Sequence, residues 1–451
     1  MSESVETVCR RVRERVSPDA DEQARMEAAV ADLTDRIEAA IDDLPVAADV
    51  IQVGSTARGT WLAGDRDIDV FVRFPADIDR ADLEEYGLEV GREVLPDGRE
   101  EYAEHPYTVG EIDGFDVDLV PCYDVADASE IQSAVDRTPF HTAYVEERLD
   151  EALAGEVRLC KQFCTGIGVY GSDLRTRGFS GYLVELLILE YGGFRELVEA
   201  AADWRPPVRF DPEGHGETTF EDPLVVVDPT DPERNVAAVA APDSVARFQH
   251  YARELLADPR ESLFVPSDPD PLDAAGVEAA VESRGTTPVA VVFDTPDLVE
   301  DDLYPQLRKS LGGVVGELDR RGFGVLRSRV LADDDRSVLF AECQVPQLPA
   351  VERHEGPPVH VRDHAGSFFE AYADGDATGP FVDGDRYVVE RERSVRTPEA
   401  LLASDAIFDV ALGVAVERQL RADYSVLSGT DVASLADRFG TELAAYFDPR
   451  P

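Results

Sequence analysis

The stretch from Val53 to Phe74 constrains the fold more than any other, because it joins a Gly-Ser turn to a strand that carries two carboxylates. Its second part, D-I-D-V-F-V-R-F, alternates at the start and is rich in Val, Ile and Phe, which predicts a β-strand over 67–74. Side chains two positions apart leave the same face of a strand, so Asp67 and Asp69 lie side by side. Such carboxylates repel each other unless a cation lies between them, and hard oxygen ligands suit Mg²⁺. The strand therefore predicts a metal site that needs a third ligand.

The turn before this strand offers donors for an anion. Gly54 and Ser55 can turn the chain so that backbone N–H groups and the Ser55 hydroxyl point at a phosphate, and Arg58 follows as a planar donor. Taken singly, these features are more often an ordinary exposed turn and an acidic edge strand. Their adjacency favours a phosphate-and-metal site, and their spacing resembles the head signature of the polymerase-β-like nucleotidyltransferases.

A neighbouring strand is expected to supply the third carboxylate. The run G-F-D-V-D-L-V-P-C-Y, from Gly114 to Tyr123, alternates and places Asp116 and Asp118 on one face. Either carboxylate could complete the site, and the spacing alone leaves both open.

Longer motifs narrow the resemblance to one family. The sequences G-S-T-A-R-G-T-W-L-A-G, V-D-L-V-P-C-Y, A-V-D-R-T-P-F-H, R-G-F-S-G-Y-L-V-E-L-L-I and D-P-E-R-N-V-A-A occur in this order within the first 260 residues. They resemble the archaeal-type, class I CCA-adding tRNA nucleotidyltransferases. The resemblance implies that Asp67, Asp69 and Asp118 are the catalytic carboxylates and hold two Mg²⁺ ions, with Asp116 outside the set. The family more often has Glu where this chain has Asp67, which is one methylene shorter.

The same resemblance implies a nucleotide-binding set. Its members are Ser55, Arg58, His141, Lys161, Tyr170 and Arg234. A lone histidine is usually structural, and only the motif T-P-F-H assigns His141 to the nucleotide. Arg234, in D-P-E-R-N-V-A-A, resembles the arginine with which the family reads the incoming base. The alternative for Arg234 is a surface arginine paired with Asp231 or Glu233.

Lys161 stands out because the chain has almost no lysine. Lys161 and Lys309 are its two lysines, and the remaining 41 of its 43 basic residues are arginine. A compact ammonium can reach a triphosphate oxygen as a point charge where a planar guanidinium does not fit. The alternative is a random survivor on a solvated helix face.

The net charge has the wrong sign for an RNA-binding protein at ordinary salt. The formal charge is −50, from 93 acidic and 43 basic residues. An acidic, lysine-poor and arginine-rich chain is typical of a salt-loving archaeon, whose cytosol is rich in KCl. Because the Debye length at molar salt is about 3 Å, the self-repulsion of the chain is largely screened. The charge therefore indicates the habitat and does not exclude an RNA partner.

The cysteines and the hydropathy pattern predict a cytoplasmic protein. The five cysteines have no metal-ligand spacing, since Cys160 and Cys164 lie one helical turn apart and the others are scattered. They are expected to be reduced thiols in a cytosol. We expect neither a membrane span nor a signal peptide, because the chain has no window of eighteen apolar residues and its start is acidic.

The periodicity predicts an α+β multidomain protein. A helix over 19–44, strands at 50–53, 67–74, 107–112 and 115–120, and a helix near 80–95 compose a polymerase-β-like catalytic head, residues 1–145. A helical middle (neck) domain is expected over 146–260, and the resemblance implies that it completes the nucleotide pocket. The stretch 258–288, dense in Pro and Asp, is expected to be a linker. Residues 270–451 form the body and the C-terminal tail.

The body is expected to be a β-α-β-β unit, with strands at 289–293, 323–331 and 337–345 and a helix at 302–320. Such a sheet can be an RNA platform or a plain structural module. A basic cluster falls on this unit and indicates phosphate contacts, although ion pairs with neighbouring acids explain it equally well. Its members are Arg308, Lys309, Arg320, Arg321, Arg327 and Arg329. In the tail we expect a helix at 363–373 and a hairpin turn at 382–385.

The predicted function is template-independent addition and repair of the 3′-terminal CCA of tRNA, from CTP and ATP, by two-metal in-line transfer with release of pyrophosphate. The resemblance implies that the body and tail bind the acceptor and T-stem region and that the chain is a homodimer. One alternative is a poly(A) polymerase or another terminal nucleotidyltransferase, against which the later motifs argue. The other is an RNA-binding protein with an inactive head, which the three carboxylates disfavour.

Overall fold

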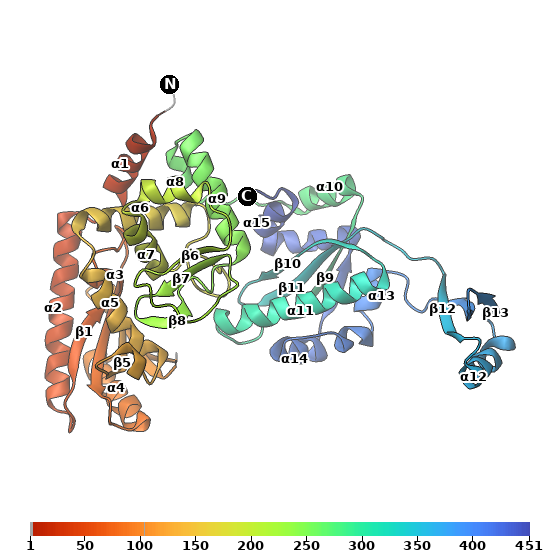
Figure 1. Ribbon diagram of the computed structural model, residues 1–451, viewed down its shortest axis with the longest axis horizontal. Helices are drawn as coiled ribbons and strands as arrows, with labels where there is room; N and C mark the ends of the chain where they lie inside the picture. The colour runs from red at the N-terminus through yellow and green to blue at the C-terminus, as the bar shows by residue number, and fades with distance from the viewer. Residues whose placement is uncertain (1–2, 103) are drawn as a thin grey trace. The chain divides into compact units, whose positions relative to one another are not determined.

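The computed structural model describes residues 3–102 and 104–451, and the chain divides into two compact units (Figure 1). Unit 1 runs to Ser267 and unit 2 covers Asp268–Arg450. The boundary falls inside the stretch that was expected to be a linker. Part of that stretch is helical, as α10 (Ala274–Arg284), because Asp273 caps the helix by accepting from the Gly276 amide (2.7 Å) and two valines on it are buried. The linker prediction is wrong for these residues.

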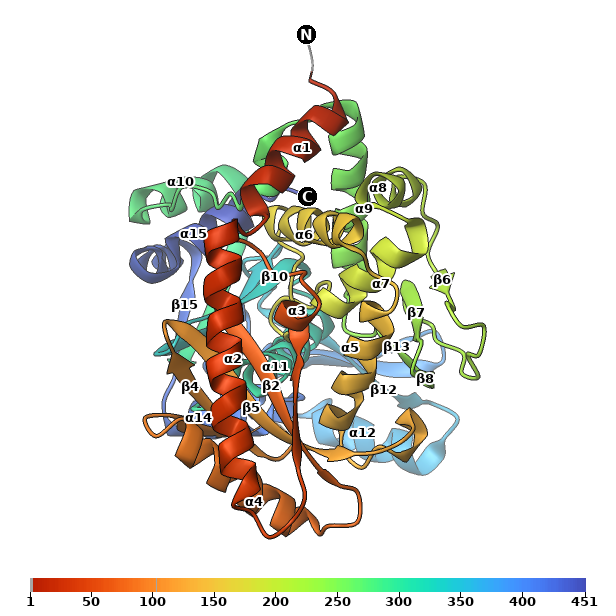
Figure 2. The ribbon, with the colours of Figure 1, turned by 90° about the vertical axis from the view of Figure 1, so that its left-hand side faces the viewer.

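The head of unit 1 is a mixed sheet covered on one face by two helices. The strand order is β1 (Asp49–Val53), β2 (Asp67–Pro75), β5 (Phe115–Asp124), β4 (Pro106–Ile112) and β3 (Arg99–Tyr102), with α2 (Ala20–Asp42) and α4 (Arg80–Val94) packed on it (Figure 2). Strands β2 and β5 are parallel, and the other neighbours are antiparallel. The two predicted helices and the four predicted strands are confirmed, and β3 is an additional strand.

The middle of unit 1 surrounds a second core. Its helices are α1 (Val5–Val16), α5 (Thr138–Glu146), α6 (Glu151–Gly166), α7 (Gly181–Tyr191), α8 (Phe194–Ala201) and α9 (Pro242–Ala257). It also contains a small sheet of β6 (Val208–Phe210), β7 (Leu224–Asp228) and β8 (Asp231–Asn235), so the prediction of a helical middle is incomplete. Helix α1, which the expected boundary groups with the head, buries Val8, Val12 and Val16 in this core, because they recur every four residues on one face.

The body of unit 2 is a sheet with both faces covered. Its order is β10 (Val325–Ala332), β11 (Arg336–Cys343), β9 (Thr287–Asp294) and β15 (Ser425–Ser428). One face packs on α11 (Glu300–Arg321) and α14 (Val414–Ala422), and the other on α10 and α15 (Ala436–Phe447). The predicted β-α-β-β elements are confirmed. Helices pack on both faces of this sheet, which therefore presents no open face to RNA.

The tail is an insertion in the body and does not end the chain. It comprises β12 (Val351–Pro358), α12 (Arg362–Ala373), β13 (Thr378–Asp383) and β14 (Arg386–Glu392), with the hairpin turn where it was predicted. The chain then returns to the body through α13 (Pro398–Leu402), α14 and β15, which pairs with β9. In the described ranges, no helix combines the length and the apolar character that a membrane crossing requires.

Candidate active site

The parallel pairing of β2 with β5 brings the predicted carboxylates together. In this register Asp69 lies beside Asp118, and Asp67 lies beside Asp116. Ile68, which lies between Asp67 and Asp69 on β2, is fully buried in the core under α2 and α4. Because side chains alternate along a strand, the aspartates leave the opposite face of the sheet.

These carboxylates repel one another. Burial, followed by the neighbouring Asp118 and Asp67 carboxylates, raises the pKa of Asp69 to about 6. Burial and neighbouring acids also raise the pKa values of Asp67 and Asp118 above the ordinary range. Acids that are costly to ionise next to one another are stabilised by a cation between them.

The turn of Gly54 lies directly against this cluster. Gly54 opens the short helix α3 (Gly54–Ala57) with a φ of +74°, and a Cβ on it would lie 1.9 Å from Asp69 Oδ2. Only glycine tolerates both the positive φ and this approach. A cavity of about 250 Å³ opens here, lined by Gly54, Asp69, Tyr107, Asp118 and Thr138 among others.

The donor set fits a divalent cation. Carboxylate oxygens are the hard ligands that Mg²⁺ and similar ions prefer, and the backbone of the turn would approach an anion held by such an ion. Within residues 3–102 and 104–451, no three His, Cys, Asp or Glu side chains are arranged as a complete ligand group. Asp67, Asp69 and Asp118, which were predicted as a three-carboxylate set, therefore do not form such a group in the described residues.

Two of the expected nucleotide-binding cations meet at a buried glutamate. Glu185, on α7, is fully buried and forms an ion pair with Arg58 Nε (2.9 Å). Its Oε1 accepts from the Thr60 hydroxyl (2.5 Å) and lies 3.9 Å from Lys161 Nζ. Lys161 Nζ in turn donates to the carbonyl (3.0 Å) and the hydroxyl (3.2 Å) of Thr60. The turn after α3 is therefore fastened to α6 and α7 of the middle domain.

The burial of Lys161 excludes one of its two interpretations. The residue is 3% exposed, so the alternative of a survivor on a solvated helix face is wrong. Burial lowers its pKa, although Glu185 acts in the opposite direction. The hydroxyl of Tyr170 lies close by, because a Cβ on Gly181 would be 3.3 Å from that oxygen and 3.7 Å from Lys161 Nζ.

A second buried carboxylate, Asp228, holds the other two predicted residues. Its Oδ2 accepts from His141 Nε2 (2.8 Å) and from Arg234 Nη1 (2.6 Å). Arg234 is therefore not paired with Asp231 or Glu233, and Asp231 pairs with Arg137 instead (3.0 Å). The motif D-P-T-D-P-E-R-N contains Asp228, but nothing in its spacing distinguishes this aspartate from Asp231.

Helix α5 connects these groups. Thr138 lines the cavity beside Asp69 and Asp118, and His141, one turn later, bonds to Asp228. The next residue, Thr142, accepts from Arg58 Nη1 (3.1 Å). The carboxylates, the turn and the Asp228 cluster are thus held by one short helix within unit 1.

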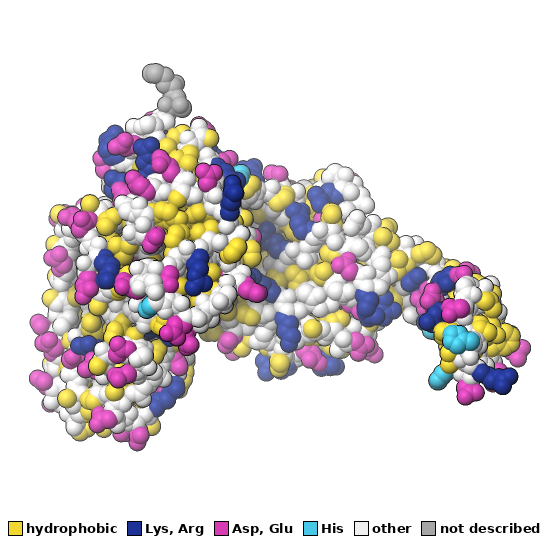
Figure 3. Space-filling view, in the orientation of Figure 1, with side chains coloured by type: hydrophobic (Ala, Val, Ile, Leu, Met, Phe, Trp, Pro, Cys, Tyr) yellow, Lys and Arg dark blue, Asp and Glu magenta, His cyan; other side chains and the backbone are white. Residues whose placement is uncertain are grey.

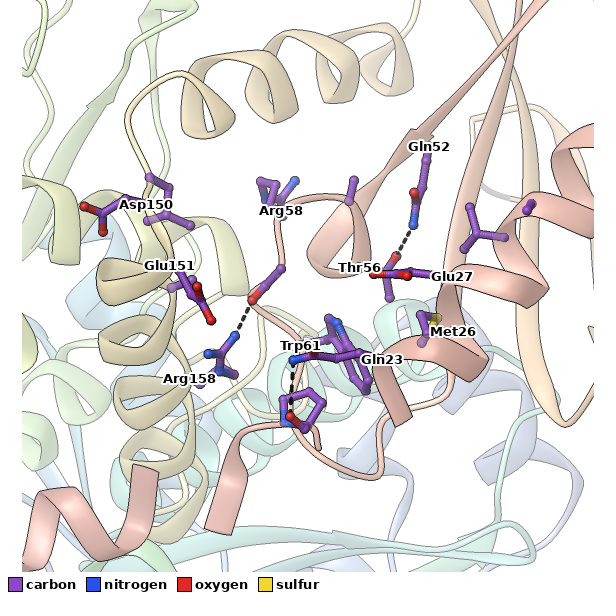
Figure 4. A pocket seen from close by; sticks show the side chains of 17 residues that line it. Gln23, Met26, Glu27, Gln52, Thr56, Arg58, Trp61, Asp150, Glu151 and Arg158 are labelled. Carbon is purple, nitrogen blue, oxygen red and sulfur yellow. Dashed lines mark hydrogen bonds between the residues drawn. The ribbon is translucent and has the colours of Figure 1, made fainter. Parts of the chain in front are cut away.

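A larger cavity, of about 500 Å³, lies behind the turn between α2 and α6 (Figure 4). Its lining includes Gln52, Thr56, Trp61 and Arg158, and Arg158 donates to the Gly59 carbonyl. Of the predicted site residues only Arg58 reaches it. The smaller cavity, which contains the carboxylates, is therefore the better candidate for the chemistry.

The predicted basic cluster of unit 2 is partly occupied by internal partners. Arg320 and Arg321 pair with the buried Glu317, and Arg327 donates to the Tyr446 carbonyl and lies over its ring, 4.1 Å from the centroid. Figure 3 shows several Lys and Arg side chains on the visible face of unit 2, with acidic ones among them. The ion-pair explanation thus holds for Arg320 and Arg321.

Three family models match successive parts of the chain. A nucleotidyltransferase domain matches 35–141, the second domain of tRNA nucleotidyltransferase matches 155–265, and the C-terminal domain of the CCA-adding enzyme matches 284–429. The head is therefore a nucleotidyltransferase domain in an α+β protein with several sheets. Nucleotidyltransferases of this superfamily typically use divalent metal ions.

Curated relatives match over all or nearly all of their length. The CCA-adding enzyme of Haloarcula marismortui is 62% identical, with all of both chains covered, and that of Halorubrum lacusprofundi is 60% identical with the same coverage. The CCA-adding enzyme of Methanosarcina barkeri is 41% identical over 94% of each chain. With such identity over its whole length, and with the carboxylates and the turn gathered in its head, this chain belongs to the family of the CCA-adding enzymes.

Proposed function

We propose that this chain adds and repairs the 3′-terminal CCA of tRNA without a template, using CTP and ATP and releasing pyrophosphate. The observation that carries the proposal is the meeting of Asp69 and Asp118 with the Gly54 turn, in a chain 62% identical to a CCA-adding enzyme over its full length. A carboxylate cluster serves a cation, and a tight glycine turn serves a triphosphate.

Asp67, Asp69 and Asp118 are proposed to hold two Mg²⁺ ions. When bound, such ions supply charge stabilisation to the attacking ribose hydroxyl and to the departing pyrophosphate. The raised pKa values of these carboxylates support this assignment, since each gains from a cation. The protein needs no nucleophile of its own, because the 3′-hydroxyl of the tRNA attacks the α-phosphate.

Ser55, Arg58, Lys161 and Tyr170 are proposed to bind the nucleotide around the turn. Arg58 and Lys161 bring positive charge next to the carboxylates. Their charges lower the pKa of Asp69, but burial and the Asp118 and Asp67 carboxylates have the larger opposite effect. With Nζ bonded to Thr60, Lys161 fixes the turn as well as adding charge. His141 joins this set through α5.

Arg234 is proposed to select the base. Cytosine presents O2 and N3 as acceptors and adenine presents N1, whereas uracil and guanine place an N–H donor at N3 or N1. A guanidinium only donates, so it satisfies the first pair and leaves an unpaired donor against the second. Its side chain is 37% exposed, so it is held by Asp228 and still accessible.

Unit 2 is proposed to bind the acceptor and T-stem region of tRNA by shape, in a homodimer, as the family resemblance implies. Because helices pack on both faces of the body sheet, the proposed contacts fall on its helices and on the partly exposed edge strand β10. The sequence predicted phosphate contacts for Arg320 and Arg321. Because both residues already form ion pairs with Glu317, they are weaker candidates for such contacts.

Incubation of the protein with tRNA that lacks its 3′ end, and with each nucleotide separately, tests the proposal. We expect two C residues from CTP alone, and one A from ATP only on tRNA that already ends in CC. Long A or U tails would identify another terminal nucleotidyltransferase. Failure to extend any tRNA in the presence of Mg²⁺ and molar KCl would indicate an inactive head.

A further inference from the structure

Asp228 is a buried carboxylate at the end of β7 with every oxygen engaged. It is fully buried, and its Oδ2 accepts from both His141 Nε2 (2.8 Å) and Arg234 Nη1 (2.6 Å). Its Oδ1 accepts from the amide and the hydroxyl of Thr230, each at 2.9 Å. A single side chain therefore joins α5, which carries His141, to β8, which carries Arg234.

The chemistry of these contacts fixes the proton on His141. A carboxylate that accepts from a guanidinium is ionised, so the imidazole nitrogen 2.8 Å from the same oxygen must donate. Burial alone would raise the pKa of Asp228, but the hydrogen bonds from His141 and the Thr230 amide, together with the charge of Arg234, outweigh it and lower that pKa. Burial lowers the pKa of His141, which favours a neutral ring with its proton on Nε2 and an acceptor at Nδ1.

The ring of His141 is fixed in orientation as well as in tautomer. It stacks on Tyr182 of α7, with ring centroids 4.0 Å apart and planes 18° apart. The Tyr182 hydroxyl lies 3.5 Å from Asp228 Oδ1, so the same carboxylate also faces the stacking partner. Neither ring can turn without breaking a contact to Asp228 or to the other ring.

We propose that Asp228 is a positioning residue for nucleotide selection, which holds Arg234 and the Nε2–H tautomer of His141 in one arrangement before the nucleotide binds. The proposal rests on the proposed role of Arg234 in base reading. A long arginine side chain that is 37% exposed has many rotamers, and ordering it anew with each nucleotide would weaken discrimination. One Nη bonded to a buried carboxylate removes most of that freedom and leaves the other N–H groups for the base.

Asp228→Asn tests the proposal, because it keeps the shape but not the charge. We compare kcat/KM for CTP and UTP on tRNA that ends before the first C, for wild type, Asp228→Asn, Arg234→Ala and the double variant. Asp228→Asn should lower the CTP preference about tenfold, as expected when a selective donor is no longer held. Arg234→Ala should lower it at least as much, and the double variant should show no further loss.

Asp231→Asn is the matched control. This aspartate is on the same hairpin and also pairs with an arginine, but the arginine is Arg137 (3.0 Å). The CTP preference of the Asp231→Asn variant should stay within about twofold of that of the wild type. If Asp228→Asn keeps the wild-type preference while Arg234→Ala loses it, or if the two losses add in the double variant, the positioning role is overturned.

The tautomer of His141 gives a readout that does not depend on activity. Nitrogen-15 NMR of the unmodified protein with labelled histidine should show the Nε2–H form for His141, and Asp228→Asn should change this signal. A wild-type Nδ1–H form would overturn the proposal whatever the kinetics show. If Arg234→Ala leaves the nucleotide preference unchanged, the base-reading role of Arg234 fails, whereas the Nε2–H signal would still show that Asp228 orients His141.

Discussion

Two groups of buried or half-buried carboxylates in unit 1 differ in what surrounds them. Asp67, Asp69 and Asp118, on β2 and β5, lie among other acids, and their pKa values are raised. Glu185 and Asp228 lie among donors and cations, and the pKa of Asp228 is lowered. Among the described residues, the first group therefore forms no ion pair with a cation, although Arg58 and Lys161 attract Asp69 through space, whereas the second group forms ion pairs within unit 1.

The difference separates carboxylates that serve the substrate from carboxylates that hold the site. A paired buried carboxylate costs little to ionise and becomes costly only when its partner is removed. An unpaired cluster costs stability until a cation arrives, which is the usual condition of a metal site. In this chain the two groups are adjacent, because the cations held by Glu185 also face Asp69.

The largest effect is expected from Asp69→Asn, which removes a ligand charge from the unpaired group. Incorporation of C and A should fall by about 10³-fold or more, since a lost metal ligand removes several kcal/mol of transition-state stabilisation. Binding of tRNA should persist, and single-turnover incorporation together with a tRNA-binding assay measures both. Asp116→Asn, on the neighbouring strand, is the control. An equal loss from it would show that the third carboxylate was assigned wrongly.

Glu185→Gln should be next in size, and its effect should be on stability. The amide keeps the shape and can bond to Thr60, but it leaves the buried Arg58 and Lys161 without a negative partner. We expect the free energy of unfolding to fall by about 3 kcal/mol, measured by urea denaturation at constant KCl. Glu261→Gln, which breaks exposed pairs to Arg11 and Arg15, should cost less than about 1 kcal/mol. Equal costs would contradict the distinction between buried and exposed pairs.

Lys161→Arg tests whether the cations of the paired group also serve the nucleotide. The bulkier planar head does not fit a position that is 3% exposed and bonded twice to Thr60, so the turn should shift. We expect the KM for CTP and ATP to rise about tenfold, with a smaller change in kcat. Lys309→Arg, at the exposed second lysine, is the control and should change neither. An unchanged KM in Lys161→Arg would limit Lys161 to a structural role.

The smallest effect concerns the stability of the metal-free protein. The pKa of Asp69 is raised from 3.8 to about 6, so its ionisation costs nothing below pH 3.8 and the full amount above pH 6. With a chelator present, Asp69→Asn should therefore be more stable than wild type by about 1 kcal/mol at pH 7, after allowance for screening. The difference should vanish near pH 4. Added Mg²⁺ should stabilise wild type more than the variant, and the same Mg²⁺ response in both would remove Asp69 from the metal site.

Much of the local structure around the site could be predicted from the sequence, because it depends on neighbours in the chain. The period of two in D-I-D-V puts Asp67 and Asp69 on one face, and the pattern of Met26, Leu33 and Ile37 makes α2 amphipathic. The hairpin turn at 382–385 follows from its own residues in the same way.

The errors lie where distant segments meet. Helix α1 joins the middle core, the tail is inserted in the body, and α10 occupies a stretch that was expected to be a linker. Each depends on apolar faces that only a partner far along the chain covers, so local composition gives little signal.

The motifs identify the candidate reactive residues, and the period of two on β2 aligns Asp67 with Asp69. The tertiary structure alone decided their partners: His141 meets Asp228 across 87 positions, and Thr60 meets Glu185 across 125. From the sequence, Asp231 and Glu233 were the candidate partners of Arg234, but in the structure Arg234 forms an ion pair with Asp228. The physical reason is that hydrogen bonds and ion pairs are set by proximity in space, and a local pattern specifies a face or a turn but not the side chain that a distant strand will place against it.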